Sequence, residues 1–211
     1  MCNSNTQKYS VQKKIDKIYN ELDGNSLYNK KKQCSLIKKI SFIKDQFTRN
    51  DIDYLYDIIK YYIEFDIYIY NSFIKLCIIK KLFYLIDEFL EELYRNGIEP
   101  NIVTYSSLID CYCNNNLLEK GEYYYNILLK NNLLNFKTAW NTIDVHGYQK
   151  WHMYFYLEQN KFKIKNNFSI ICGRGNNSEE DPVLKEVIID FCNKYNLTYK
   201  ICCKGGKITI K

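Results

Sequence analysis

The chain is poor in histidine and proline, and it contains no long apolar run. Only two of its 211 residues are histidines, His146 and His152, and only two are prolines. Its nine cysteines include no Cys-x-x-Cys pair, so a zinc finger or zinc ribbon is not expected. No stretch approaches the roughly 18 apolar residues that a membrane-spanning helix needs. We therefore expect no membrane partner.

The cysteines are also unlike those of a secreted disulfide framework. Their number is odd, and the only close pairs are Cys111 with Cys113 and Cys202 with Cys203. This usage is typical of a reducing compartment. We expect most of the thiols to be small buried hydrophobic groups. The net charge of +6 permits a nucleic-acid partner without demanding one.

The first two thirds of the chain predict helices with an internal repeat. We expect an N-terminal helical segment at 1–32 and helical repeats at 33–137. Within the latter, 68–102 aligns with 103–137 without a gap, and 33–67 is a degenerate unit. Tyr-Asn-Ser-Phe-Ile at 70–74 matches Tyr-Ser-Ser-Leu-Ile at 105–109. A fixed period of helix pairs predicts stacked hairpins, because one hairpin cannot bury its own apolar face.

The repeat at 68–102 closes with Asn-Gly-Ile-Glu-Pro-Asn at 96–101, and it resembles a pentatricopeptide (PPR) repeat. The resemblance implies an α-helical solenoid that reads single-stranded RNA at about one base per repeat. Carried over, the base-reading pair is Asn71 and Asn101, with Ser106 and Phe136 at the same positions of the next block. The alternative is structural, because such polar residues near a helix start also cap or solvate it.

The last 70 residues predict a small α/β sandwich. Strands are expected at 142–145, 168–172, 197–202 and 207–210, and helices at 150–160 and from Asp181-Pro182 onward. The element order is therefore β-α-β-α-β-β over 142–211. Two polar, glycine-containing turns, at 144–147 and 172–178, follow the first two strands. Turns of this kind carry ligand-binding groups in α/β sheets.

These two turns and the element order resemble the Smr (small MutS-related) domain. Asp-Val-His-Gly at 144–147 fits the Asp-x-His-Gly motif of that family, and Cys-Gly-Arg-Gly at 172–175 fits its Gly-x-Gly motif. Cys172 stands where the family has Thr or His. The resemblance implies an endonuclease that acts on RNA or DNA. PPR repeats followed by an Smr domain form a known architecture.

The residues of the two turns suit phosphodiester cleavage. His146 carries an imidazole, the side chain most often used for proton transfer in catalysis, and is the candidate for that role. Asp144 can orient His146 or hold a divalent metal such as Mg²⁺ or Mn²⁺, and the sequence leaves both options open. Arg174 is a further catalytic candidate that can clamp a phosphate, with phosphate binding without catalysis as the alternative, and backbone N–H groups at Gly173 and Gly175 can approach the same phosphate closely. The alternative is that Asp144 and His146 only fix the turn. His152 is expected to be exposed or half-buried.

The sequence therefore predicts an RNA-binding PPR–Smr protein that cleaves single-stranded RNA, with DNA as a further possible substrate. One alternative is a non-catalytic RNA-binding factor whose Smr domain is a second nucleic-acid contact. Another is a protein-interaction scaffold of helical hairpins. Family association implies RNA processing in a mitochondrion or plastid-type organelle, with the cytoplasm as the alternative. The oligomeric state is left open.

Overall fold

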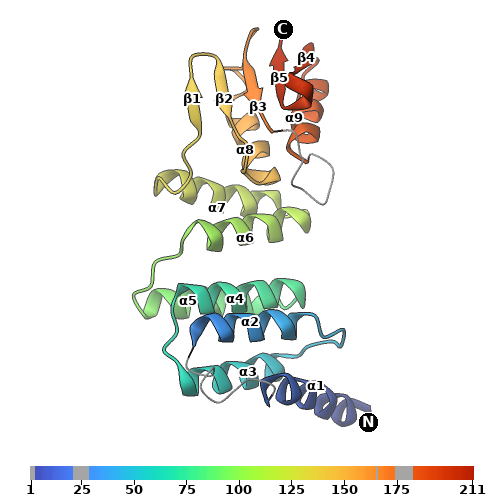
Figure 1. The fold of residues 1–211 in the computed structure, drawn as a ribbon, viewed down its shortest axis with the longest axis vertical. Coiled ribbons are helices and arrows are strands. Elements are labelled where there is room, and N and C mark those ends of the chain that lie inside the picture. The colour runs from blue at the N-terminus through green and yellow to red at the C-terminus, as the bar shows by residue number, and fades with distance from the viewer. Residues whose placement is uncertain (1–2, 21–28, 165, 174–182) are drawn as a thin grey trace. The chain divides into compact units, whose positions relative to one another are not determined.

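The computed structural model of the chain describes residues 3–20, 29–164, 166–173 and 183–211. It divides into two compact units, residues 1–107 and 108–211. Helices make up the first unit, and the second contains a five-stranded mixed sheet together with further helices (Figure 1). This confirms the expected combination of helical repeats and a small C-terminal sheet. None of the described helices is both long and apolar enough to cross a membrane.

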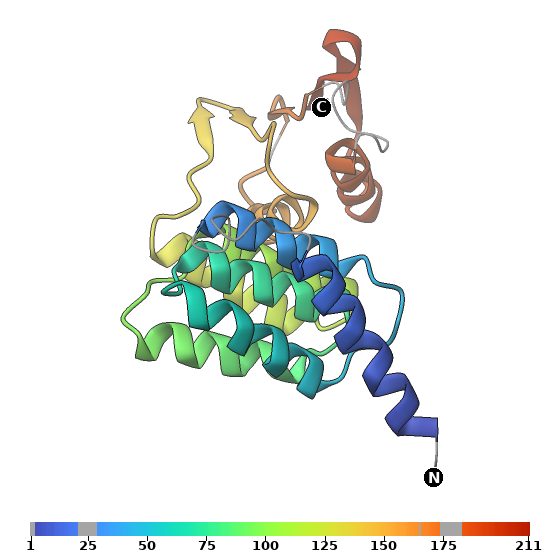
Figure 2. The same ribbon diagram turned by 60° about the horizontal axis from the view of Figure 1, so that its bottom comes forward.

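The helices of the first unit follow one another through short connections. They are α1 (Asn3–Asn20), α2 (Lys30–Ser41), α3 (Arg49–Tyr62), α4 (Ile67–Ile79), α5 (Tyr84–Arg95) and the start of α6 (Ile102–Asn114). α4 packs against both α2 and α5, and these three helices run side by side (Figure 2). α2 begins at Lys30, where the side chain of Asn29 accepts hydrogen bonds from the N–H groups of Lys31 and Lys32.

The helix bounds recur with the period seen in the sequence. α4 starts at Ile67 and α6 at Ile102, which is 35 residues later, and their ends are separated by the same number. The caps recur as well. Asp66 accepts from the N–H groups of the second and third residues of α4, and Asn101 does the same for α6. The repeat is thus a repeat of helix starts as well as of apolar positions.

Aromatic and branched aliphatic side chains fill the interior of the first unit. Phe73 is fully buried and its ring lies 5.3 Å from that of Phe89 and 5.7 Å from that of Phe65, centroid to centroid. Tyr56 packs its ring edge on Phe65 at 4.7 Å. These contacts join α3, α4 and α5, so the packing of this unit depends on rings from three successive helices and on Phe65 in the connection between α3 and α4.

The second unit starts with the end of α6 and with α7 (Leu118–Lys130), which packs against α8 (Lys150–Asn160). Gly121 allows a close approach of α6 and α7, because a Cβ at this position would lie 2.2 Å from the Sγ of Cys113. The ring of Tyr125 lies 5.3 Å from that of Phe155 on α8. α7 therefore belongs to the same compact unit as the sheet.

The sheet has the strand order β1-β2-β3-β5-β4. Its elements are β1 (Lys137–Ala139), β2 (Thr142–Asp144), α8, β3 (Ser169–Ile171), α9 (Val183–Lys194), β4 (Tyr199–Cys202) and β5 (Lys207–Ile210). β2 and β3 are parallel and are connected through α8, whereas the other pairs are antiparallel. The predicted order β-α-β-α-β-β is present from β2 to β5. β1 was missed, because three exposed residues without apolar alternation become a strand only through pairing with β2.

One face of this sheet is buried under α8 and α9, which pack against each other. Ile143, Ile170 and Ile208 lie in one row across β2, β3 and β5 and are fully buried. Their partners from the helices include Met153 and Ile188. Because side chains alternate along a strand, the residues between these isoleucines point to the opposite face. The described helices of this unit leave that face uncovered.

Candidate functional site

The residues predicted to read an RNA base, Asn71 and Asn101, lie together in the first unit. The side-chain amide of Asn71 donates to the side-chain oxygen of Asn101 over 3.2 Å. Both side chains are half-buried. The same oxygen of Asn101 also caps α6, where it accepts from the N–H groups of Val103 and Thr104 at 3.0 and 3.1 Å. Asn101 therefore has a structural role, and base reading by the pair stays a prediction.

A third residue, Thr104, joins this pair. Its buried hydroxyl lies 2.7 Å from the side-chain oxygen of Asn71 and 3.2 Å from that of Asn101, and it accepts from the N–H of Asn101 at 3.1 Å. The network holds the two asparagine side chains in one orientation. The sequence analysis missed Thr104, although the spacing Asn101-x-x-Thr104 is typical of a helix start whose first and fourth residues cap each other.

The corresponding positions of the next block differ in their surroundings. Ser106 is buried, with an exposed fraction of 5%, on the first half of α6. Phe136 packs against the core of the sheet unit, with its ring 4.7 Å from that of Tyr148 and 4.6 Å from that of Tyr156. A role of Ser106 in RNA reading stays a prediction.

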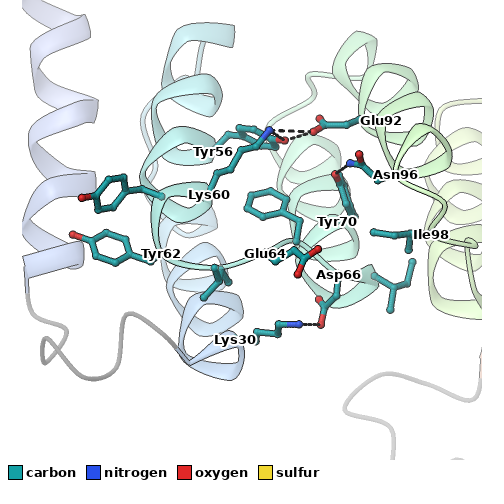
Figure 3. A pocket seen from close by; sticks show the side chains of 14 residues that line it. Lys30, Tyr56, Lys60, Tyr62, Glu64, Asp66, Tyr70, Glu92, Asn96 and Ile98 are labelled. Carbon is teal, nitrogen blue, oxygen red and sulfur yellow. Dashed lines mark hydrogen bonds and ion pairs between the residues drawn. The ribbon is translucent and has the colours of Figure 1, made fainter.

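The first unit also contains a cavity of about 920 Å³ between the ends of α3 and α5 and the start of α4 (Figure 3). Four of its charged residues form two ion pairs: Lys30 lies 3.1 Å from Asp66, and Lys60 lies 3.7 Å from Glu92. Burial, and next the hydrogen bond that it donates to Glu92, raise the pKa of Tyr56. Neither Asn71 nor Asn101 lines this cavity, so it is separate from the predicted base-reading pair.

In the second unit the first predicted turn lies beside Gly173, in the first part of the second turn, at the carboxyl ends of β2 and β3. β2 and β3 are parallel, with Asp144 opposite Ile171, and the N–H of Val145 donates to the carbonyl of Ile171 at 2.8 Å. Because of this pairing, His146, which follows the end of β2, lies beside Gly173. A Cβ built on Gly173 would lie 3.6 Å from the Cβ of His146. The carboxyl ends of two parallel strands thus bring together residues that are 27 positions apart (173 − 146).

Two glycines shape this edge. Gly147 has a φ of +83° and Gly173 a φ of +78°, a region that side-chain-bearing residues rarely adopt. Gly147 turns the chain after His146, and Gly173 lies shortly after β3. Both motifs therefore have glycine where the backbone requires it, and Gly173 also lets the second turn approach the histidine.

Asp144 and His146 form a directly bonded pair. The Nδ1 of His146 lies 2.5 Å from the Oδ1 of Asp144, and the backbone N–H of His146 donates to the same oxygen at 3.1 Å. Burial raises the pKa of Asp144, but the hydrogen bonds from His146 and the charges of His146 and Lys137 together outweigh it, so the pKa lies below its ordinary value. The carboxylate is charged near neutral pH, and it orients the imidazole.

The pair lines a cavity of about 280 Å³ together with Lys137, Gly147 and Tyr148. Lys137 reaches this place because β1 pairs with β2 and sets Lys137 opposite Asp144. The hydroxyl of Tyr148 donates to the carbonyl of Asn135 at 2.5 Å. The sequence analysis missed Lys137, and no local signal could have found it, since its place depends on a strand pairing.

Other predicted residues of the second turn lie outside the described residues. These are Arg174 and Gly175, together with the turn residues 176–178 and the helix start at Asp181-Pro182. Cys172, just before them, is buried, and burial raises the pKa of its thiol. In the part of the chain that is described, no three His, Cys, Asp or Glu side chains gather into a possible metal site.

Two further expectations concern the burial of the cysteines and of His152. Cysteines are mostly buried, as expected; the buried ones are Cys77, Cys111, Cys113, Cys172 and Cys192. His152 is not exposed or half-buried, because it lies on the face of α8 that packs on α7 and has an exposed fraction of 3%. Burial lowers the pKa of its imidazole to about 4. His152 is therefore neutral at physiological pH.

Comparison with known proteins gives one family match. The model of the PPR repeat family matches residues 66–114, which cover α4, α5 and α6 with both capped helix starts. No curated protein matches the chain. The match at the repeat described above supports a pentatricopeptide repeat protein, and the PPR repeat implies that this protein binds RNA.

Proposed function

We propose that the protein is an RNA-binding endonuclease, in which the PPR repeats hold single-stranded RNA and the C-terminal α/β unit, which resembles an Smr domain, cleaves it. DNA is a second possible substrate. The observation that carries the proposal is the Asp144–His146 pair beside Gly173 in a cavity at the carboxyl ends of two parallel strands. This edge of a parallel sheet is the usual place for ligands in α/β proteins.

The hydrogen bond to Asp144 determines which nitrogen of His146 is available. In the neutral imidazole one nitrogen carries the proton and the other accepts. Because the Nδ1 of His146 faces the charged carboxylate at 2.5 Å, the proton resides on Nδ1 and the lone pair on Nε2. Nε2 can then take the proton of the attacking oxygen as a general base. The imidazole is more than half exposed, so a substrate can reach it.

The charge of the phosphate needs stabilisation by groups at the same edge. Lys137 lines the cavity with His146 and supplies a positive charge there. The backbone around Gly173 has no side chain that would keep a phosphate at a distance. Arg174 and Gly175 follow directly in the chain, and we propose them as further phosphate ligands on the strength of the motif alone.

Cleavage of end-labelled single-stranded RNA by the purified protein tests the proposal. Reactions run with and without Mg²⁺ or Mn²⁺, since both remain possible cofactors. His146→Ala should lower the cleavage rate by about 10²- to 10⁴-fold, the usual contribution of a general base. Asp144→Asn should also lower the cleavage rate, because a neutral amide replaces the charged carboxylate that accepts the hydrogen bond from the imidazole and orients it. RNA retention on a filter should be unchanged in both variants.

Asp190→Asn is the matched control for Asp144→Asn, since Asp190 is an exposed acid on α9 away from the cavity. It should leave the cleavage rate unchanged. Equal cleavage by wild type and His146→Ala would refute the proposed active site. RNA that is bound but never cut would instead favour the non-catalytic RNA-binding factor.

We also propose that this RNA processing takes place in a mitochondrion or plastid-type organelle. The support is the PPR repeat, since proteins of this family usually act there. Fluorescence imaging of the full chain with a C-terminal tag, compared with an organelle dye, tests the assignment. A uniform cytoplasmic signal would contradict it.

A further inference from the structure

The uncovered face of the sheet in residues 108–211 carries more lysines than acids, and its other members are hydroxyl residues together with Ala139, Ile171 and Cys202. It presents the alternate residues of each strand, opposite to the buried isoleucines. Its charged members are three lysines and one acid: Lys137, Lys200, Lys207 and Asp144. Hydroxyl groups lie between them; those of Ser169 and Thr209 are 3.0 Å apart and bond to each other, and Ser169 is buried. This face therefore carries a net positive charge and many hydrogen-bonding groups.

The connection between β1 and β2 carries an unusual residue at its tip. Ala139 pairs with Thr142, so Trp140 and Asn141 form a two-residue turn. Trp140 has a φ of +49°, although glycine and asparagine are the residues that tolerate this conformation. Its side chain is also fully exposed. Both the backbone conformation and the exposure of the largest apolar side chain oppose folding, which indicates that Trp140 is present for binding.

The strand register connects this tip to the candidate active site. Lys137, at the other end of β1, lies opposite Asp144 and lines the cavity. Thr142, which follows this turn, and Asp144 are two residues apart along β2, a distance of about 7 Å at a rise of about 3.3 Å per residue. Lys207 lies in the same row as Lys137, three strands away, at about 14 Å for a strand spacing of about 4.8 Å.

We propose that this sheet face, which we call the lysine face, is a second single-stranded RNA contact that leads the RNA to His146. Trp140 stacks on a base, and Lys137, Lys200 and Lys207 contact phosphates. Any base can stack on an aromatic ring, and lysines contact only the phosphates of the RNA backbone. The contact therefore adds affinity without specificity. The position of the cleaved bond near His146 rests on the proposed function, whereas the contact itself does not.

The fluorescence of Trp140 provides a direct test. The chain has two tryptophans, Trp140 and Trp151, so Trp151→Phe leaves Trp140 as the single reporter. Titration of the full Trp151→Phe protein with an unlabelled oligonucleotide of mixed sequence should quench the Trp140 emission as RNA binds. In the otherwise native chain, Trp140→Ala should weaken RNA binding about ten-fold, a typical loss for one stacked base. Trp140→Phe should recover part of the affinity.

Phe162→Ala is the matched control. Phe162 is also an exposed aromatic residue, with an exposed fraction of 83%, and it stands between Lys161 and Lys163. It follows α8, whose helix covers the opposite face of the sheet. Its removal should leave RNA affinity unchanged. Equal losses from Phe162→Ala and Trp140→Ala would mean that any exposed ring matters and would overturn the assignment to the lysine face.

The salt dependence of affinity tests the lysines. Each phosphate contact contributes about 0.7 to the slope of log K against log salt concentration for single strands. Replacement of Lys137, Lys200 and Lys207 by Gln should therefore reduce the slope by about 2. An unchanged slope, or RNA binding without any change in Trp140 fluorescence, would overturn the proposal.

These outcomes remain distinct from those of the nuclease test. Quenching of Trp140 in a protein that does not cut RNA would support the lysine face while the endonuclease proposal fails. Cleavage that depends on His146, with no quenching of Trp140 and no effect of Trp140→Ala, would support the endonuclease proposal and overturn the lysine face.

Discussion

The buried histidine of α8 leads to a specific prediction about stability and pH. His152 has an exposed fraction of 3% and packs near the ring of Tyr125, with centroids 6.5 Å apart. Burial lowers the pKa of its imidazole from 6.5 to about 4. Between these values the unfolded chain binds a proton that the folded chain does not. Stability is therefore complete above about pH 6.5 and is lost as the pH falls toward 4.

Linkage gives the size of the effect. With pKa values of 6.5 unfolded and about 4 folded, the contribution of His152 to the free energy of unfolding falls by about 1.2 kcal/mol between pH 7 and pH 5.5. It falls by about 2.5 kcal/mol between pH 7 and pH 4.5. A His152→Gln variant has no ionising group at this position, so its stability should lack this component.

Urea denaturation followed by tryptophan fluorescence measures this difference. Both tryptophans lie in residues 108–211, so the signal reports the unit that contains His152. The stability of wild type minus that of His152→Gln is taken at pH 7, 5.5 and 4.5, and effects of all other groups cancel. A difference that stays constant over this range would refute the reasoning, because the imidazole would then ionise equally in both states.

Three further predictions concern other buried contacts. Burial raises the pKa of Asp110 to about 6, so between about pH 4 and 6 the folded chain holds the extra proton and stability falls as the pH rises. Asp110→Asn should remove this slope in urea denaturation and stabilise the unit by on the order of 2 kcal/mol at pH 7; a retained slope would contradict it. Gly121→Ala should destabilise the same unit by about 1–3 kcal/mol, since the new Cβ meets the Sγ of Cys113. The added change Cys113→Ala should restore part of this loss, and an absence of rescue would count against the steric cause. Thr104→Val removes the hydroxyl that joins the two asparagines of the repeat. It should lower the free energy of unfolding by about 1 kcal/mol, measured by thermal unfolding, and it should weaken RNA binding. Unchanged RNA affinity would mean that the network does not position the two asparagines for RNA.

Much of the fold was predictable because it depends on local patterns. The 35-residue period appears in the apolar positions and in the helix starts, since each block repeats the same capped helix pair. The helix at 150–160 and the strand at 207–210 were predicted at their observed bounds. The apolar pattern does not show where α2 starts, because its first residues, 30–32, are exposed and the start is set by the cap at Asn29.

The candidate site was predictable only in part. Asp144 and His146 are two residues apart, and a strand end brings such residues together by itself. The place of Gly173 beside His146 depends on the parallel pairing of β2 and β3, and that of Lys137 depends on β1. Thr104 joins Asn71 and Asn101 only because the starts of α4 and α6 lie next to each other.

The sequence by itself determined the elements of this protein: the helix pairs and their period, the alternating strands, the capped helix starts and the glycines of the two turns. All of these depend on residues a few positions apart. Only the tertiary structure decided which elements meet. It buried His152, exposed Trp140 at a hairpin tip and placed three lysines on one sheet face. Strand pairing and helix packing join distant residues, and their energies depend on the whole fold rather than on any local pattern.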